Sequence, residues 1–530
     1  MYVDHALIVP RTVMERGYQS ALARSCLKAS TLLVLPTGLG KTVIALRVAA
    51  EVLNARGGKA LFLAPTRPLV AQTANYLGQH LVDRSVGIMT GTSAPSKRRE
   101  SWERNDVLVA TPQSVANDLD NGSFDLDGVS LIVYDEAHRA VGNYAYVRVA
   151  MHNRSALSLG MTASPGATRK RIQQVCANLG LREMEWRDDG DKDVAPHVHG
   201  VDVRIIEVAP PEHMHEVQEL LRRLQGPSLD VLVKMHLMKN DRPATVPYLL
   251  QVDRNIRSRM GGKGGGYMFR AMSANAAAIK VAHAIELAGC QSTAALKRYV
   301  EKLKREGASK SGSRASKQLA ASPELGEIER LLENADEHPK MRIVGDLVRE
   351  QLQHMPSSKV IVFTNYRDSC DAVVEMLSLL PGVRASRLVG QARRFGDRGQ
   401  KQEQQVGVLE KLRDGTINVV VATCIGEEGL DVANTDLVIF YEPVPSEIRS
   451  IQRRGRTGRS RAGQVVVLVT AGTRDVSSLQ AAAGKERAMH RHLARFKGAS
   501  PLVPELSGPS TCPAPPLSCG GSDDHRPNVP

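Results

Sequence analysis

Buried strands alternate with helices along residues 30–165. Short apolar runs at 31–35, 60–64, 107–110 and 129–134 have the pattern of buried strands. The segment 41–56 places apolar residues at helical spacing and stops at Gly57-Gly58, a common helix terminator. Strands that alternate with helices predict a parallel sheet covered on both faces. In such sheets, ligands bind beyond the carboxyl ends of the strands.

The same alternation restarts near residue 358. Further strand-like runs occupy 359–364, 418–423, 437–441 and 464–469. Between the two regions, 205–335 has a helical pattern after one opening strand-like run at 203–208. The predicted fold class is therefore α/β, with two similar parallel-sheet domains separated by a helical insertion. We expect domains at 1–200, 201–335 and 336–498, followed by a disordered Pro-, Ser- and Gly-rich tail at 499–530.

Charge is concentrated in the insertion. The chain of 530 residues has 70 Lys and Arg against 56 Asp and Glu, a net charge of +14. Residues 251–320 hold 14 basic and 4 acidic residues, so 14 − 4 = +10 falls in this segment. A solvated helical surface would explain some of this charge, but its density favours an arm that contacts phosphates.

Composition narrows the cellular setting. No apolar run approaches the roughly 20 residues that cross a bilayer, and the amino terminus lacks the pattern of a signal peptide. The seven cysteines include no C-x-x-C pair, which argues against a zinc site or a disulfide framework. We therefore expect a cytoplasmic protein with no membrane partner, associated with the nucleoid if its source is archaeal.

A glycine-containing loop at 36–42 joins the first strand to a helix. Gly38 and Gly40 let the backbone approach a phosphate chain, Lys41 would neutralise the phosphates, and the Thr42 hydroxyl would bind Mg²⁺. The strict phosphate-loop pattern has glycine where Leu35 stands, so a chance glycine turn was the alternative. The strand–loop–helix context favours phosphate binding.

Two adjacent carboxylates follow the strand 129–134. Asp135 would hold Mg²⁺, directly or through water, and Glu136 would polarise the attacking water. Adjacent acids are usually just solvated, but their position downstream of a phosphate loop predicts a nucleoside triphosphatase.

Arginines spaced by glycine lie in the second α/β domain, at 452–459. Such arginines stabilise the charge on a transferring phosphoryl group, an effect of about 10³- to 10⁵-fold in GTPases. A general basic patch on nucleic acid was the alternative. A phosphate loop and arginine fingers on different domains would make ATP the ligand that closes the cleft.

The ordered motifs resemble those of helicase superfamily 2 over most of residues 8–480, which implies two RecA-like domains. In chain order the matching segments are 16–19, 36–42, 64–69, 110–113, 135–138, 162–164, 423–431 and 452–459. The sequences of 138–146 and 441–451 resemble the corresponding segments of archaeal Hef helicases and Fanconi anaemia group M translocases. These act on forks and Holliday junctions and carry a helical insertion, which by resemblance would grip duplex DNA near a branch.

The resemblance implies a role for each matched residue. Gln19 would read adenine. The residues expected around the remainder of the nucleotide are Thr37, Gly38, Gly40, Lys41, Thr42, Asp135, Glu136, Gly429, Asp431, Gln452, Arg456 and Arg459. Those expected along the DNA backbone are Arg67, Thr111, Gln113 and Thr423, although Arg67 could be an ordinary surface residue and the threonines could cap turns. His138, Thr162 and Ser164 would couple the nucleotide state to the DNA grip.

These observations predict an ATP- and Mg²⁺-dependent DNA helicase or translocase that acts on forked or branched DNA. The expected partners are DNA and a separate nuclease or sliding clamp, and a monomer is expected. Because no nuclease signature follows residue 499, we predict no nuclease domain. The alternatives are a double-stranded RNA translocase, whose helicase also carries a helical insertion, and an ATP-regulated platform that binds branched DNA and recruits a nuclease.

Overall fold

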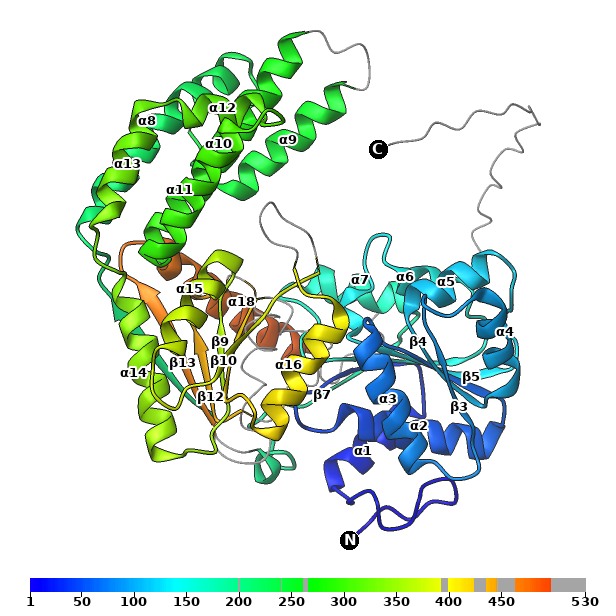
Figure 1. Ribbon diagram of the computed structural model, residues 1–530. Coiled ribbons are helices and arrows are strands. Elements are labelled where there is room, and N and C mark those ends of the chain that lie inside the picture. The colour runs from blue at the N-terminus through cyan, green and yellow to red at the C-terminus, as the bar shows by residue number, and fades with distance from the viewer. Residues whose placement is uncertain are drawn as a thin grey trace, which may run out of the picture.

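A computed structural model describes residues 1–198, 201–239, 241–260, 266–391, 399–423, 435–444, 446 and 463–496. Two α/β lobes lie side by side, and a helical bundle stands on the second of them (Figure 1). We call residues 1–198 lobe 1, residues 213–338 the bundle, and residues 201–208 together with 339–496 lobe 2. This arrangement confirms the predicted fold class.

The described residues of lobe 1 form a seven-stranded parallel sheet of order β3-β4-β2-β5-β6-β1-β7. Its strands are β1 (Thr31–Val34), β2 (Lys59–Leu63), β3 (Val86–Met89), β4 (Val107–Ala110), β5 (Val129–Asp135), β6 (Leu157–Thr162) and β7 (Glu183–Trp186). The four predicted strands are confirmed as β1, β2, β4 and β5. Helices cover both faces: α1 (Gly17–Cys26), α2 (Lys41–Arg56), α3 (Arg67–His80), α4 (Pro95–Arg104), α5 (Pro112–Asp120), α6 (Ala145–Met151) and α7 (Arg169–Leu179), with short 3₁₀ turns at Ala137–Arg139 and Ala195–His197.

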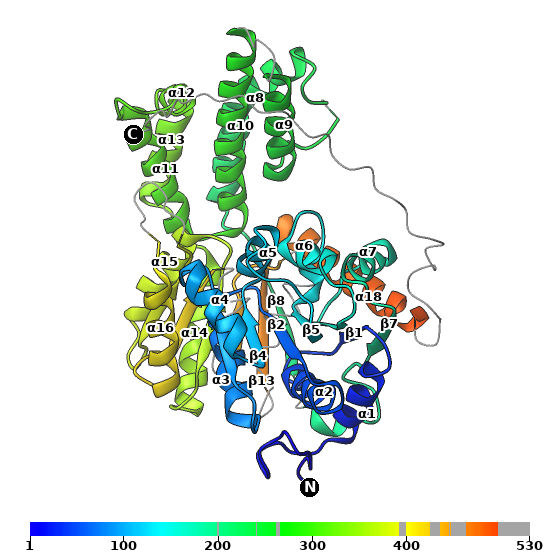
Figure 2. The same ribbon diagram turned by 90° about the vertical axis from the view of Figure 1, so that its right-hand side faces the viewer.

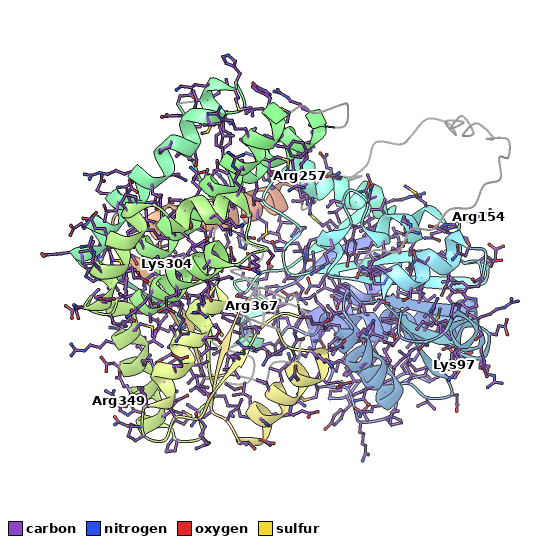
Figure 3. All side chains as sticks on the ribbon, turned by 45° about the horizontal axis from the view of Figure 1, so that its top comes forward. Lys97, Arg154, Arg257, Lys304, Arg349 and Arg367 are labelled. Atoms are coloured by element: carbon purple, nitrogen blue, oxygen red, sulfur yellow. The ribbon has the colours of Figure 1, made fainter. Side chains whose placement is uncertain are left out.

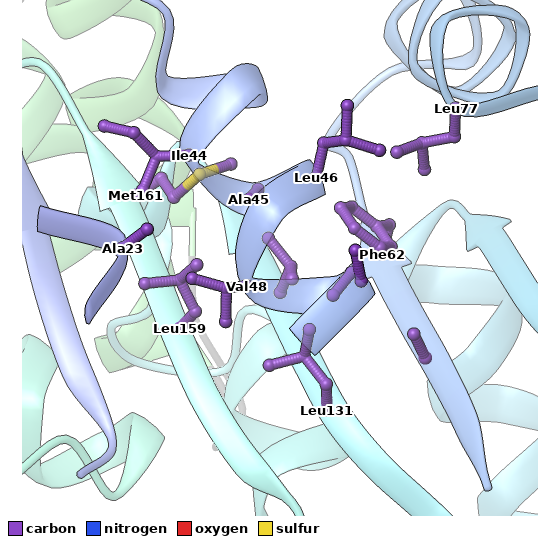
Figure 4. Close-up of a cluster of buried hydrophobic side chains, with 14 of the residues drawn as sticks. Ala23, Ile44, Ala45, Leu46, Val48, Phe62, Leu77, Leu131, Leu159 and Met161 are labelled. Carbon is purple, nitrogen blue, oxygen red and sulfur yellow. The ribbon is translucent and has the colours of Figure 1, made fainter. Parts of the chain in front are cut away.

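Alternate side chains of each strand feed two separate cores. Leu33 of β1 packs into the core under α1, α2 and α3, whereas its neighbour Leu32 faces the core under α5, α6 and α7. Figure 4 shows the first of these cores, in which Ile44 and Val48 of α2 approach Leu159 of β6. This packing fixes α2, and with it the preceding loop, at the carboxyl end of β1.

Lobe 2 repeats the design with a six-stranded parallel sheet of order β10-β11-β9-β12-β13-β8 among the described residues. Its strands are β8 (Val201–Val208), β9 (Val360–Phe363), β10 (Ala385–Leu388), β11 (Val419–Ala422), β12 (Leu437–Phe440) and β13 (Gly463–Thr470). Its helices are α14 (Pro339–His354), α15 (Arg367–Ser378), α16 (Gln402–Asp414) and α18 (Arg474–Phe496).

The assignment of residues 201–208 to the insertion is wrong. All eight residues of β8 pair with β13, so the strand belongs to the sheet of lobe 2. As an edge strand it needs backbone partners more than burial, and Val203 and Ile205 stay 44% and 55% exposed. Because so little of β8 is buried, its sequence has no apolar pattern that would predict pairing with β13, which follows about 260 residues later in the chain.

The helical insertion is confirmed as a bundle. Its helices are α8 (His213–Lys234), α9 (Val246–Met260), α10 (Gly266–Cys290), α11 (Thr293–Ala308), α12 (Arg314–Ala320) and α13 (Pro323–Glu333). Serine side chains cap two of them, since the hydroxyl of Ser292 accepts from Ala295 N–H and that of Ser313 from Ser316 N–H. The central helix α10 packs against α8 and α9.

The last described helix, α18, runs from lobe 2 onto lobe 1. It starts after β13, and its far end lies beside α7 and β7 in Figure 2. Three buried side chains near its end, Met489, Leu493 and Phe496, belong to the second core of lobe 1. The two lobes therefore share part of one hydrophobic core.

A buried ion pair fastens the bundle, α14 and α18 together. Lys340 of α14 is fully buried and donates to the carboxylate of Asp475, at the start of α18, and to the backbone oxygen of Cys290 at 3.3 Å. Asp475 also accepts from the backbone N–H of Thr470 at 3.0 Å. Lys340 Nζ lies 5.4 Å from the ring centre of Tyr441.

No helix in the described part of the chain is long and apolar enough to cross a bilayer.

Candidate active site

The loop between β1 and α2 has the backbone shape of a phosphate cradle. Gly38 and Gly40 have φ angles of 87° and 79°, values that side chains disfavour. Gly40 occupies the N-cap of α2, so the first N–H groups of the helix point into the loop. This geometry suits an anion at the helix start.

The Lys41 side chain folds back over this loop. Its Nζ donates to the backbone oxygens of Leu35 at 2.8 Å and Pro36 at 3.2 Å. The ammonium group is therefore held at the centre of the cradle, and Leu35, which departs from the strict motif, contributes only its backbone oxygen.

Two side chains of α1 brace the loop from outside. The Tyr18 hydroxyl donates to the Leu39 backbone oxygen at 2.8 Å, and Gln19 Nε2 donates to the same oxygen at 3.1 Å. Gln19 is 3% exposed, and its role in reading adenine stays a prediction. The sequence did not single out Tyr18, although it is adjacent to a predicted site residue.

The contact between Gln19 and Gly40 makes a testable prediction. A Cβ at residue 40 would lie 2.5 Å from Gln19 Nε2, so Gly40→Ala must push the amide off Leu39 and deform the cradle. We expect ATP affinity to fall at least about tenfold, together with a loss of roughly 1–2 kcal/mol of stability from the left-handed backbone. Titration with a fluorescent ATP analogue and thermal unfolding measure the two effects.

Gly57→Ala is the matched control for this prediction. Gly57 also has a positive φ, 65°, but open space surrounds the position of its Cβ. This variant should lose stability while keeping ATP affinity. Equal affinity losses in the two variants would contradict a specific role for the contact between Gln19 and Gly40.

Asp135 lies at the end of β5, next to the start of α2. Asp135 and Thr42 both line a small cavity of about 10 Å³, room for roughly one water. Burial, followed by the charge of Glu136, raises the pKa of Asp135 to about 7, and the charge of Lys41 opposes this rise. Most of the other described lining residues are apolar, but a carboxylate and a hydroxyl on one small cavity fit the oxygen ligands that Mg²⁺ prefers.

The surroundings of Glu136 shift its pKa in the direction opposite to that of Asp135. Its burial alone would raise the pKa, but the hydrogen bond and charge of His138, with the charges of Lys41 and Arg139, hold that pKa below its usual range. His138 Nδ1 lies 3.3 Å from Glu136 Oε2. Glu136 also has a φ of 51°, a strained backbone conformation for a glutamate. An ionised, rigidly held carboxylate is suited to accept a proton from water.

Tyr146 ties the ends of two strands together beneath these acids. Its hydroxyl contacts the backbone oxygens of Asp135 and, at 3.1 Å, Leu63 at the end of β2. Its ring meets those of Tyr134 and Tyr144 edge-on. Tyr146 was noted only as part of a family resemblance, because an aromatic residue in a short helix has no pattern that predicts this role.

The three predicted coupling residues are in contact. His138 Nδ1 lies 3.1 Å from Thr162 Oγ1, which in turn accepts from the backbone N–H of Ser164 at 3.1 Å. Ser164 Oγ lies 3.0 Å from Met489 Sδ, on α18. A continuous path of contacts therefore leads from Glu136 to the helix that arrives from lobe 2.

The predicted DNA-binding residues follow the carboxyl ends of strands. Arg67 and Gln113 are exposed, at the starts of α3 and α5. Thr111 is buried at the N-cap of α5, and its hydroxyl bonds to that of Ser114 at 2.8 Å without capping a backbone N–H. Thr423 is buried after β11.

Thr37 is half-buried in the loop between β1 and α2. The other predicted site residues lie outside the described residues. They are Gly429, Asp431, Gln452, Arg456 and Arg459.

Comparison with known proteins places this geometry in a family. The family model described as "Type III restriction enzyme, res subunit" matches residues 13–167, and the "Helicase conserved C-terminal domain" matches 339–461. A model for the helical bundle of a provisionally named ATP-dependent RNA helicase family matches 213–338. The crystal structure of the Pyrococcus furiosus Hef helicase domain superposes with a TM-score of 0.64 and 41% identity, over 89% of this chain and 98% of that one.

The chain belongs to the Hef-type helicases of superfamily 2. It is an ATP-dependent helicase. The predicted resemblance is confirmed.

Hef-type relatives differ in length and in the nucleic acid that their names give. A Methanocaldococcus jannaschii protein, provisionally named an ATP-dependent RNA helicase, is 35% identical over 93% of this chain and 62% of its own length. The Neurospora crassa ATP-dependent DNA helicase mph1 is 33% identical over 86% of this chain and 41% of its own. The chain thus spans under two thirds of these relatives.

Proposed function

We propose that this helicase uses ATP hydrolysis to move along DNA and to remodel forks and other branched DNA. The observation that carries the proposal is the combination of the lobe 1 site with a basic bundle that stands on lobe 2. The 41% identity to a Hef helicase domain and the DNA helicase names of the fungal relatives support DNA as the substrate.

The described residues suggest how ATP would be hydrolysed. Lys41 would contact the phosphates, Thr42 and Asp135 would hold Mg²⁺, and Glu136 would take a proton from the attacking water. Bound Mg²⁺ would supply charge neutralisation at the phosphates. We propose that Gln452, Arg456 and Arg459 of lobe 2 complete the site, with Gly429 and Asp431 near the ribose.

The bundle is the proposed DNA grip. Its helix α9 lies on the side toward lobe 1 in Figure 1 and carries the exposed arginines Arg254, Arg257 and Arg259. Figure 3 labels Arg257 on α9 and Lys304 on α11, which pair with Asp253 and Glu329 respectively. Phosphate contacts of this kind would bind DNA without reading its sequence.

A double-stranded RNA translocase is the second candidate, and the name of the M. jannaschii relative favours it. A third is a platform that binds branched DNA and recruits a nuclease, in which ATP only sets the conformation. We propose a cytoplasmic monomer that works with such a partner while hydrolysing ATP.

Stimulation of ATP hydrolysis by different nucleic acids separates these candidates. Forked DNA should stimulate hydrolysis at least about tenfold, linear duplex DNA less, and duplex RNA little or not at all. Lys41→Ala should abolish the stimulated rate, because it removes the cation of the phosphate cradle. Greater stimulation by duplex RNA than by forked DNA would overturn the proposal in favour of an RNA translocase.

A further inference from the structure

The free face of α18 carries a row of arginines. Arg487, Arg491 and Arg495 follow one another at four-residue intervals, so they share one side of the helix. All three are exposed, whereas Met489 and Leu493, on the opposite side, are buried in lobe 1. We call these three residues the arginine row.

An open groove accompanies the row. It has a volume of about 630 Å³, and the described residues that line it are Gly484, Arg487, His490 and Arg491. Gly484 has no side chain to fill the groove, and nothing lies within 4 Å of where its Cβ would be. Within the described part of the chain, no ion pair joins Arg487, Arg491 or Arg495 to a carboxylate.

Helix α7 extends this basic surface. Arg169 places its guanidinium 5.6 Å from the ring centre of Phe496, at the end of α18, and Lys170 beside it is also exposed. Both cations lie in the first turn of α7, where the helix dipole disfavours positive charge. An anionic ligand would offset this local cost.

Acidic residues near this surface in the chain are Glu486, next to Arg487, and those of the loop after β7, two of which have partners of their own. Asp191 accepts from the backbone N–H of Asp188 at 2.8 Å, and Asp193 pairs with Arg187 at 3.2 Å. The described part of α18 has no exposed Phe, Tyr or Trp, and the half-buried Trp186 of β7 already contacts His490, with 6.1 Å between the ring centres. The chemistry fits a chain of phosphates.

We propose that the arginine row binds the phosphate backbone of a second DNA arm at a branch. This inference rests on the proposed function. From Arg487 to Arg495 the helix rises about 12 Å, enough to span several phosphates spaced about 3.4 Å apart along the duplex axis. The proposed grip on α9 stands on the bundle, whereas the row lies where α18 packs on lobe 1 beside α7 and β7 (Figure 2), so a separate arm is the fitting ligand for the row.

The double variant R487E/R491E tests this site. A three-way junction and a linear duplex with the sequence of one of its arms are titrated at several salt concentrations. We expect junction affinity to fall at least about tenfold and its salt dependence to lose about 2 units of slope, near 0.9 for each lost phosphate contact. Binding of the linear duplex, and the ATPase rate it stimulates, should stay unchanged.

The matched control is R342E/R349E on α14, which makes the same change in net charge. Both residues pair with Asp346 on the surface, and Arg349 lies at the outer edge of lobe 2 in Figure 3. Equal losses in the control, or equal losses of linear-duplex binding, would overturn the inference. Unchanged junction binding with lost binding to anionic lipid vesicles would overturn it in favour of a membrane surface.

The two proposals fail in different ways. If wild-type protein shows no stimulation by any DNA, the proposed function fails. If wild-type protein prefers junctions and R487E/R491E keeps that preference, only the arginine row is refuted.

Discussion

Replacing Glu136 with glutamine should lower the DNA-stimulated ATPase kcat by about 10²- to 10⁴-fold, the usual contribution of a general base. Glutamine keeps the size of the side chain but cannot accept the proton of the attacking water. The surroundings that hold the pKa of Glu136 low, with His138 3.3 Å away, would then stabilise no ionised carboxylate. Steady-state hydrolysis with saturating forked DNA measures the effect.

Two measurements make this result specific. ATP binding by the Glu136→Gln protein should match wild type, because Lys41 and the cradle remain. Glu103→Gln, an exposed glutamate on α4 paired with Arg99, should leave kcat unchanged. A Glu136→Gln protein with kcat within threefold of wild type would rule out this residue as the base. Fork remodelling that survives the loss of hydrolysis would support the platform alternative.

Replacing Lys340 with methionine should destabilise lobe 2 by about 3–5 kcal/mol, the usual result of leaving one buried charge without its partner. The buried Asp475 carboxylate would lose its charged partner and keep uncharged ones, the N–H of Thr470 and the thiol of Cys290. Urea denaturation followed by hydrogen exchange of the β13 amides measures the loss in lobe 2 itself, without assuming that the whole chain unfolds in one step.

A second substitution and a surface pair provide the controls. Asp475→Asn in the Lys340→Met background removes the unpaired charge and keeps an acceptor for Thr470, so it should restore part of the stability. Arg305→Met breaks the exposed pair with Glu301 and should cost no more than about 0.5 kcal/mol. If Lys340→Met and Arg305→Met cost the same, the buried pair contributes nothing beyond a surface contact.

The central strands could be predicted from sequence, and the edges could not. β1, β2, β4 and β5 are continuous apolar runs because both of their faces are buried. β10 reads Ala-Ser-Arg-Leu and is mostly half-buried, so it has no such run. The placement of β8 and the crossing of α18 depend on partners far away in the chain, which local periodicity does not encode.

The proposed catalytic groups of lobe 1 could be placed from the sequence because the chemistry expected of them restricts residue type and spacing. Gly40, Lys41, Thr42, Asp135 and Glu136 converge as expected at the ends of β1 and β5. The supporting groups were not predictable. Tyr18 and Tyr146 act through hydroxyl bonds to backbone oxygens, and any hydroxyl at the right place would serve.

Both chain connections of the bundle lead into the same lobe. The chain enters the bundle from β8, which pairs with β13 along its full length. It leaves the bundle directly into α14, which Lys340 anchors to α18. A rotation of lobe 2 must therefore move the bundle with it as a rigid extension. A small change of angle at the nucleotide would then produce a larger displacement at the tip of α9 and α10.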